Sequence, residues 1–359
     1  MDFDPTRLTA DFGDPVREAI ACRTTAALFD FSFMSRGVVT GPGAVNVIAT
    51  LTRRQIADLP VGRIRYAVRE TPNGYVVADL TVWRTGDQEW EVMSGRSVDI
   101  ADLQAASCSA ASCRAHARTV PPANVRDLSA QTRIYAVQGP QALNVLRPLL
   151  QPQEANRLAA LTYYGCGDFL LAGIPVRIGR LGYTGERGFE LIVAAADGAA
   201  LWNKLAPRAC PAGFIAADML RIEAGFVLFA NEFRVPVTSA ESGLGNFAEA
   251  TKGPYASRCI HSGLARPIRL VSFRALTNVC VTLFQPPSGV SRPNRNDELI
   301  VTSACNSIAA QSVLGLGYVL SERNPAAALQ DSCGAISDIE LVPRPYFDPE
   351  KRRPREPWN

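Results

Sequence analysis

The chain has 359 residues, of which 47% are hydrophobic and 20% are charged, and its formal net charge is +3. This length is too great for one ordinary core and predicts two or three domains. The small net charge provides no extended basic field, which argues against a nucleic-acid-binding protein. Because there are only two histidines, His116 and His261, a histidine-based nucleophilic site or a catalytic zinc site is disfavoured.

No apolar run reaches the roughly 20 residues that a membrane helix needs. The first residues, MDFDPTRLTADFGDP, lack the basic and then apolar pattern of a signal peptide. We therefore expect a cytoplasmic protein without a membrane partner. Nine cysteines spread along the chain favour buried free thiols over a disulfide framework. The tightest group, Cys108, Cys113 and His116, fits no standard zinc spacing, and we expect no metal site.

The first part of the chain alternates predicted helices and strands. Apolar spacing predicts a helix over residues 14–24, strands at 27–33 and 36–39, and a helix at 44–51 after the turn Gly41-Pro42-Gly43. Alternating residues predict a β-hairpin over 74–93, which places Asp79 within a strand and not in a loop. The Ala/Ser-rich stretch 105–122 is predicted to be a linker.

A second unit is predicted to begin at Arg133. It contains a strand ending at Gly139-Pro140, a helix through Leu150, a hairpin over 168–178 that turns at Gly173, and a helix over 194–206. A further helix is predicted over 216–229, with Asp218 early enough to cap it or to complement its dipole. From about residue 262, short β-type segments between Pro and Gly turns predict a separate β-rich domain.

Nine short motifs occur in an order that is typical of one family. They are LFDFSFM at 28–34, VTGP at 39–42, ADLTV at 78–82, VQGP at 137–140, GYTGERGFE at 182–190, LRIEAGFVLFANEF at 220–233, ESGLG at 241–245, VTSA at 301–304 and GLGYV at 315–319. In these motifs the chain resembles the folate-dependent aminomethyltransferase (glycine cleavage T-protein) superfamily.

The resemblance implies an α+β fold, a three-domain cloverleaf with a C-terminal β-barrel, around a central hole that holds the pterin of a folate. We accordingly expect a folate-binding region of two α+β subdomains over residues 1–258. A barrel domain over 259–347 and a basic tail over 348–359 are expected to follow.

Two carboxylates carry the predicted site. A pterin presents an N–H beside an exocyclic amine, and a carboxylate can accept both as a two-point hydrogen bond. By the resemblance, Glu190 holds the pterin in this way, while the glycines of its motif permit a tight turn. The resemblance also implies that Asp79 lies at N5/N10, where a carboxylate can take a proton and stabilise a cationic one-carbon species. The other predicted pocket residues are Tyr183, Ser94, Tyr164, Trp83 and Tyr163.

The chain departs from the T-protein pattern at several positions. Ala217 stands where T-proteins have an arginine that contacts the cofactor, and Ala78 replaces the first of a usual pair of aspartates. ADLTV and Ser94-Gly95 are more similar to the folate domains of dimethylglycine and sarcosine dehydrogenases. The GxGxxG fingerprint of their flavin half is missing near the start of this chain. These departures leave the identity of the one-carbon donor open.

The sequence therefore predicts a tetrahydrofolate-dependent one-carbon transferase, an aminomethyl- or methyltransferase that acts on a small-molecule donor. The candidate protein partners are a carrier protein and an amine oxidase. Two alternatives stay open: an O-, S- or N-demethylase of a small metabolite, and a non-catalytic folate-binding protein in iron–sulfur maintenance. Lys252-Gly253-Pro254 argues against the second, because that branch has cysteine in place of the proline. The basic residues available for a polyglutamate tail or an acidic carrier, or for plain surface charge, are Lys252, Lys351, Arg352, Arg353 and Arg355.

Overall fold

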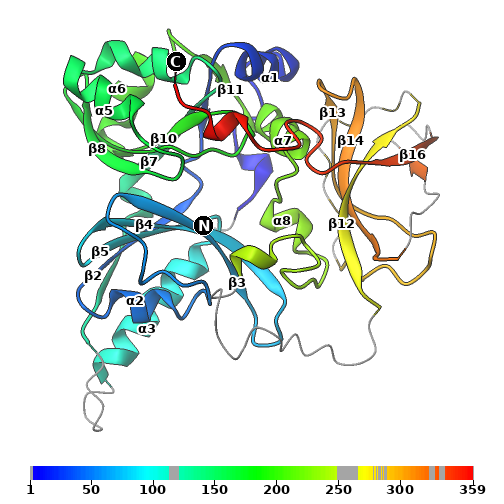
Figure 1. Cartoon of the computed structure of the whole chain (residues 1–359), viewed down its shortest axis with the longest axis horizontal. Helices are drawn as coiled ribbons and strands as arrows, with labels where there is room; N and C mark the ends of the chain where they lie inside the picture. The colour runs from blue at the N-terminus through cyan, green and yellow to red at the C-terminus, as the bar shows by residue number, and fades with distance from the viewer. Residues whose placement is uncertain are drawn as a thin grey trace.

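The computed structural model describes residues 3–112, 121–248, 266–277, 279, 281, 284, 286, 289–322, 328–330 and 336–358. Three β-sheets form three lobes, and a short helical segment lies between them (Figure 1). This arrangement confirms the predicted α+β fold with three lobes. None of the helices in the described ranges combines the length and the apolar character needed to cross a membrane.

The first sheet has six strands in the order β11-β1-β7-β10-β9-β8, with only β1 and β11 parallel among its recorded pairs. Four helices belong to this lobe, and its own core lies between helices and sheet. The predicted hairpin and helices here are confirmed within a few residues. The bounds are β1 (Ala27–Asp30), β7 (Thr132–Gln138), β8 (Cys166–Leu171), β9 (Ile174–Gly179), β10 (Gly188–Ala194), β11 (Cys210–Ala212), α1 (Pro15–Thr24), α4 (Ala142–Leu146), α5 (Pro152–Ala159) and α6 (Ala195–Leu205).

The second sheet has five antiparallel strands in the order β3-β4-β5-β2-β6 and carries helices α2 and α3. The predicted 74–93 hairpin is confirmed as β4 and β5. The predicted linker over 105–122 is wrong in its first part, because α3 continues to Ser112; residues 113–120 lie outside the described ranges. The bounds are β2 (Ser35–Thr40), β3 (Arg63–Glu70), β4 (Val76–Gly86), β5 (Glu89–Ser94), β6 (Asn124–Asp127), α2 (Ala44–Ile48) and α3 (Ser97–Ser112).

The third sheet contains the β-rich C-terminal part of the chain and is antiparallel, in the order β13-β14-β12-β16-β15. Its outer strands, β13 and β15, are not paired with each other among the described residues, so the expected barrel is observed as a five-stranded sheet. The boundary predicted at 258/259 lies outside the described ranges. The bounds are β12 (Ile268–Ala275), β13 (Ile300–Ser307), β14 (Ser312–Leu320), β15 (Ala328–Gln330) and β16 (Ile336–Val342).

Helix α7 (Phe214–Glu223) connects the first lobe to the third, packing on α1 and β13. The prediction of one helix over 216–229 is wrong at its end. Gly225 has φ +67°, and the amides of Gly225 and Phe226 donate to the carbonyls of Ile222 and Arg221. This is the glycine-terminated C-cap that closes many helices. A short second helix, α8 (Phe229–Glu232), follows.

A buried charge network joins α7, α8 and β13. The Arg221 side chain lies 2.8 Å from Asp218, 3.0 Å from Glu232 and 2.6 Å from the hydroxyl of Ser303. Thr302 donates to Glu232 at 2.8 Å. Asp218 neither caps α7, whose N-cap is Gly213, nor lies in its first turn, so both predicted roles are wrong. It neutralises Arg221 instead, because a buried guanidinium needs carboxylate partners.

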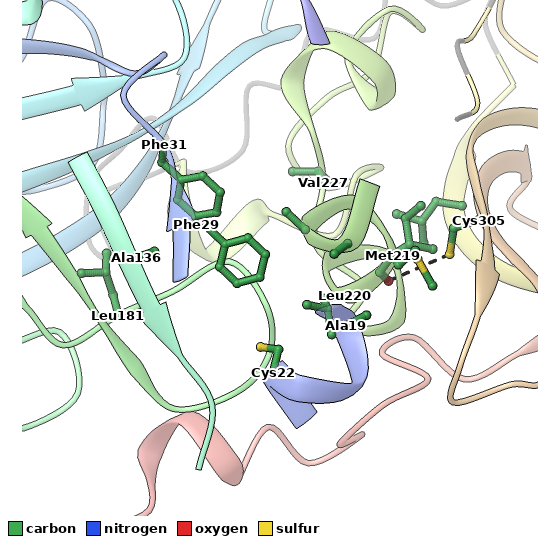
Figure 2. Close-up of a cluster of buried hydrophobic side chains, with 14 of the residues drawn as sticks. Ala19, Cys22, Phe29, Phe31, Ala136, Leu181, Met219, Leu220, Val227 and Cys305 are labelled. Carbon is green, nitrogen blue, oxygen red and sulfur yellow. Dashed lines mark hydrogen bonds between the residues drawn. The ribbon is translucent and has the colours of Figure 1, made fainter. Parts of the chain in front are cut away.

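One hydrophobic cluster extends through all three lobes. It contains Phe29 from β1 of the first sheet, Met93 from β5 of the second and Cys305 from β13 of the third. Met219 of α7 lies among them (Figure 2). The Cys305 thiol lies 3.9 Å from the Met219 carbonyl oxygen. Since the same cluster touches every sheet, the three lobes form one packed body around α7.

The last described residues return from the third lobe to the first, as the red segment of Figure 1 shows. The amides of Tyr346 and Phe347 donate to the Glu223 carbonyl at the end of α7. Further along, Arg353 lies 3.1 Å from Glu186, and the Trp358 ring stacks on Phe189 at 5.1 Å between ring centroids. We call residues 343–358 the C-terminal segment.

Candidate functional site

The lobes enclose a cavity of about 440 Å³, a volume in the range of small-molecule sites. Its wall combines strands of the first two sheets, the chain after α7 and the C-terminal segment. Eleven aromatic side chains contribute to this wall: Phe31, Phe33, Tyr66, Tyr163, Tyr164, Tyr183, Phe214, Phe226, Phe229, Phe247 and Phe347.

Glu190 lies on β10, a central strand of the first sheet, between Ala136 and Gly179. Glu190 is only 7% exposed, yet its side chain lines the cavity. It has no hydrogen bond or ion pair with any described residue. Burial alone raises the pKa of Glu190 from 4.5 to about 7. A buried carboxyl group without a protein partner is costly unless a ligand supplies one.

Asp79 reaches the same cavity from β4 of the second sheet. The Tyr66 hydroxyl on the neighbouring strand β3 donates to its Oδ2 at 3.1 Å. Burial raises the pKa of Asp79 to about 6, and the hydrogen bond from Tyr66 acts in the opposite direction. The fields of Asp99 and Glu232 add to the increase. Asp79 is thus mostly ionised at neutral pH and still close to its pKa.

Three predicted tyrosines line the cavity. The Tyr183 hydroxyl donates to the Val227 carbonyl at 2.6 Å, which fixes its ring against the chain after α7. The rings of Tyr163 and Tyr164 meet edge to face at 4.7 Å. Tyr164 has φ +61°, which is uncommon for a bulky residue and typical of functional or strained positions.

Two predicted pocket residues do not line the cavity. Trp83 is fully buried in the core, where its indole N–H donates to Thr81 at 2.9 Å. Ser94 is buried with its hydroxyl on Asp99, although its neighbour Gly95 does line the cavity. Both side chains are therefore surrounded by the protein core and do not reach the cavity.

The glycines of the GYTGERGFE motif have two different uses. Gly185 has φ +78°, as the predicted turn requires. Gly182 and Gly188 instead approach Gln138, where a Cβ atom would lie 1.8 Å and 2.7 Å from its side chain. The motif therefore combines a turn with close packing on β7.

The predicted basic residues divide into two sets. Lys351 and Arg355 line the cavity, whereas Arg353 pairs with Glu186 and Arg352 with Glu350. Ala217 is 1% exposed in the core and is not a lining residue. Lys252, Cys113 and His116 lie outside the described ranges. Within those ranges no group of three histidine, cysteine or acidic residues is placed to hold a metal ion.

Tyr66 and Arg344 are among the lining residues that the sequence did not predict. Tyr66 was missed because strand β3 was not predicted. Apolar or aromatic residues do stand at every second position there, at Ile64, Tyr66 and Val68, although Ala67 interrupts the arginines on the other side. Arg344 also lines the cavity. It belongs to a segment remote in sequence from every other lining element, and no local pattern marks it.

The comparisons agree with this arrangement. The family described as the GCVT N-terminal domain matches residues 6–252. An aminomethyltransferase of Saccharopolyspora erythraea is 31% identical over 96% of this chain and 91% of its own length. One from Streptomyces avermitilis is 34% identical over 72% of this chain and 68% of its own length.

Among solved structures, the glycine cleavage system aminomethyltransferase T from Bartonella henselae is similar with a TM-score of 0.69 and 22% identity. The match covers 96% of this chain and 91% of that one, and it supports the three-lobed fold. Taken with the family match over residues 6–252 and the full-length relatives, it leads to one conclusion: the chain belongs to the GCVT aminomethyltransferase family.

Proposed function

We propose that the cavity binds tetrahydrofolate and that the chain transfers a one-carbon unit from a small-molecule donor to it. The observation that carries the proposal is a pair of carboxyl groups from two different sheets, Glu190 and Asp79, that face one aromatic cavity. Both have pKa values raised towards neutrality. Such pairs are typical of acid–base sites.

The residues present fit a reduced pterin. Aromatic walls accept a flat ring by offset or edge contacts. The Glu190 carboxylate, which no described residue engages, can accept two adjacent N–H donors in the plane of that ring. Tetrahydrofolate, when bound, supplies the amine nitrogens that take up the carbon.

The protein's own groups then have distinct tasks. Glu190 binds and orients the ring as a carboxylate, and Asp79 takes a proton at the reacting nitrogen. The negative charge of Asp79 also stabilises positive charge on the transferred carbon, in a cavity where electrostatic interactions are stronger than in water. Tyr66 positions the Asp79 carboxylate through the 3.1 Å hydrogen bond.

The test compares Asp79→Asn and Glu190→Gln with the wild type. Purified protein is mixed with tetrahydrofolate and candidate amine or methoxy donors, and methylene- or methyl-folate is measured. We expect Glu190→Gln to weaken tetrahydrofolate binding about ten- to a hundredfold. Asp79→Asn should lower kcat about a hundredfold or more while binding is kept.

The matched control is Glu89→Gln, a change on β5 at a carboxylate that does not line the cavity. Wild-type values for both cavity variants would contradict the proposal. The cytoplasmic location, and a carrier protein or an amine oxidase as partner, stay predictions of the sequence.

A further inference from the structure

Arg344 lines the cavity and forms no ion pair with a carboxylate in the part of the chain that the structure describes. Its Nη2 donates to the Ser242 carbonyl oxygen at 3.2 Å. Its Nη1 is buried and has no hydrogen-bond partner among the described residues. No carboxylate within those residues forms an ion pair with it. Glu232, whose field reaches it, is already bound by Arg221 and Thr302.

The backbone around Arg344 is built to hold this side chain. Gly225 and Gly243 flank it from two different loops, with φ +67° and +74°. A Cβ atom at Gly243 would lie 2.2 Å from Nη2 of Arg344, and one at Gly225 would lie 2.8 Å from its Cγ. Since the amides of Tyr346 and Phe347 are also fixed on Glu223, the guanidinium is held in place before any ligand arrives.

The cavity as a whole favours an anionic ligand. Its lining contains five basic residues, Arg54, Arg65, Arg344, Lys351 and Arg355, and three acidic ones, Asp79, Glu190 and Asp348. Two of the three acids have raised pKa values. Burial lowers the pKa of Arg344, so a bound anion would remove an existing electrostatic penalty.

We propose that the Arg344 guanidinium binds a carboxylate group of a ligand inside the cavity. A carboxylate matches the planar fork of an arginine and would engage the buried Nη1, for which no described residue supplies a partner. The proposal rests on the proposed function for its two sources of carboxylate, the glutamyl tail of tetrahydrofolate and the carboxyl group of an amino-acid donor.

Calorimetric titration of the full chain tests the proposal with matched probes. Tetrahydrofolate is compared with 6-methyltetrahydropterin, which has the reduced ring without a carboxylate. N-methylglycine is compared with its neutral amide. We expect Arg344→Gln to weaken binding of one carboxylate probe about ten- to a hundredfold and to leave the uncharged analogues unchanged. If Arg344→Gln loses affinity for tetrahydrofolate, Arg344 binds the carboxylate of the glutamyl tail. If it loses affinity for N-methylglycine, Arg344 binds the carboxyl group of the donor.

Two further variants separate binding from folding. Arg352→Gln removes the same charge from the same segment outside the cavity and should match the wild type. Arg344→Lys keeps the charge without the fork and should recover part of the affinity. Arg344 is a half-buried cation that pairs with no carboxylate among the described residues. The melting temperature of Arg344→Gln should therefore be no lower than that of the wild type in the absence of ligand.

The outcomes distinguish this proposal from the proposed function. If Arg344→Gln binds both carboxylates as the wild type does, or loses the uncharged analogues equally, Arg344 does not bind a carboxylate, whatever happens with tetrahydrofolate. The same follows if the wild type binds neither carboxylate probe. If the wild type binds N-methylglycine through Arg344 and not tetrahydrofolate, the folate proposal fails while this one stands.

Discussion

At the scale of single residues, the cavity carboxyl groups oppose the stability of the ligand-free fold. Glu190 has a pKa of about 7 when folded and 4.5 ordinarily, so the folded protein keeps a proton that the unfolded chain releases. The free energy of unfolding therefore falls as the pH rises from about 4.5 to about 7. Such a cost is common where a protein keeps polar groups for a ligand.

Asp79 allows a test at this scale through Tyr66. The hydrogen bond from Tyr66 lowers the pKa of Asp79 against the effect of burial. Activity should need the ionised form and decline as the pH falls through about 6. Tyr66→Phe should move this acid limb of the kcat profile upward by about one pH unit.

The control for this shift is Tyr183→Phe, which loses a hydroxyl bonded to the Val227 carbonyl and to no carboxylate. An acid limb that stays in place in Tyr66→Phe would exclude the positioning role. The sequence pointed to Asp79 and Glu190 because both stand in recognisable motifs. It could not point to Tyr66, whose function depends on the register of β3 against β4.

At the scale of elements, the network of α7, α8 and β13 should dominate the stability of the central region. Arg221→Met would leave the carboxylates of Asp218 and Glu232 buried without a cation. We expect a loss of about 3–5 kcal/mol in the free energy of unfolding, measured by denaturant titration. Arg274→Met, which breaks the exposed pair with Glu340, should lower the free energy of unfolding far less, because solvent screens an exposed ion pair. If both variants lost the same free energy of unfolding, the buried network would stabilise the protein no more than an exposed ion pair does.

Helices and strands were predictable where residues within or next to the element determine its bounds. The hairpin of β4 and β5 follows from alternation and the Gly86-Asp87 turn, and α1 begins after the N-cap Asp14. Helix α7 ends earlier than its apolar spacing predicts, since the spacing continues to Val227 while Gly225 takes a positive φ. Composition predicts a linker for the Ala/Ser-rich stretch, yet alanine is the strongest helix former, and α3 occupies its first part.

At the scale of the whole molecule, the cavity depends on the C-terminal segment. Removing residues 349–359 would take Lys351, Pro354 and Arg355 from its wall and the Trp358 ring from Phe189. We expect a folded protein whose melting temperature is a few degrees lower. Its dissociation constant for tetrahydrofolate should be at least about tenfold higher.

Trp358→Ala is the comparison for the truncation, because it removes the anchor on Phe189 and keeps the wall residues. Trp358→Ala should lower the melting temperature, and it should raise the dissociation constant for tetrahydrofolate less than the truncation does. A truncated protein with wild-type affinity would show that the segment is only a structural brace.

The return of the C-terminal segment also fixes when the site can exist during synthesis. Residues 344–355 are translated after all three sheets, and the wall they complete is missing until they have left the ribosome. The three lobes can therefore begin to fold during translation, as domains do. Ligand binding cannot stabilise them at that stage, because the cavity is incomplete. Changes that remove or displace this segment should therefore reduce ligand binding by the finished protein more than they reduce its solubility.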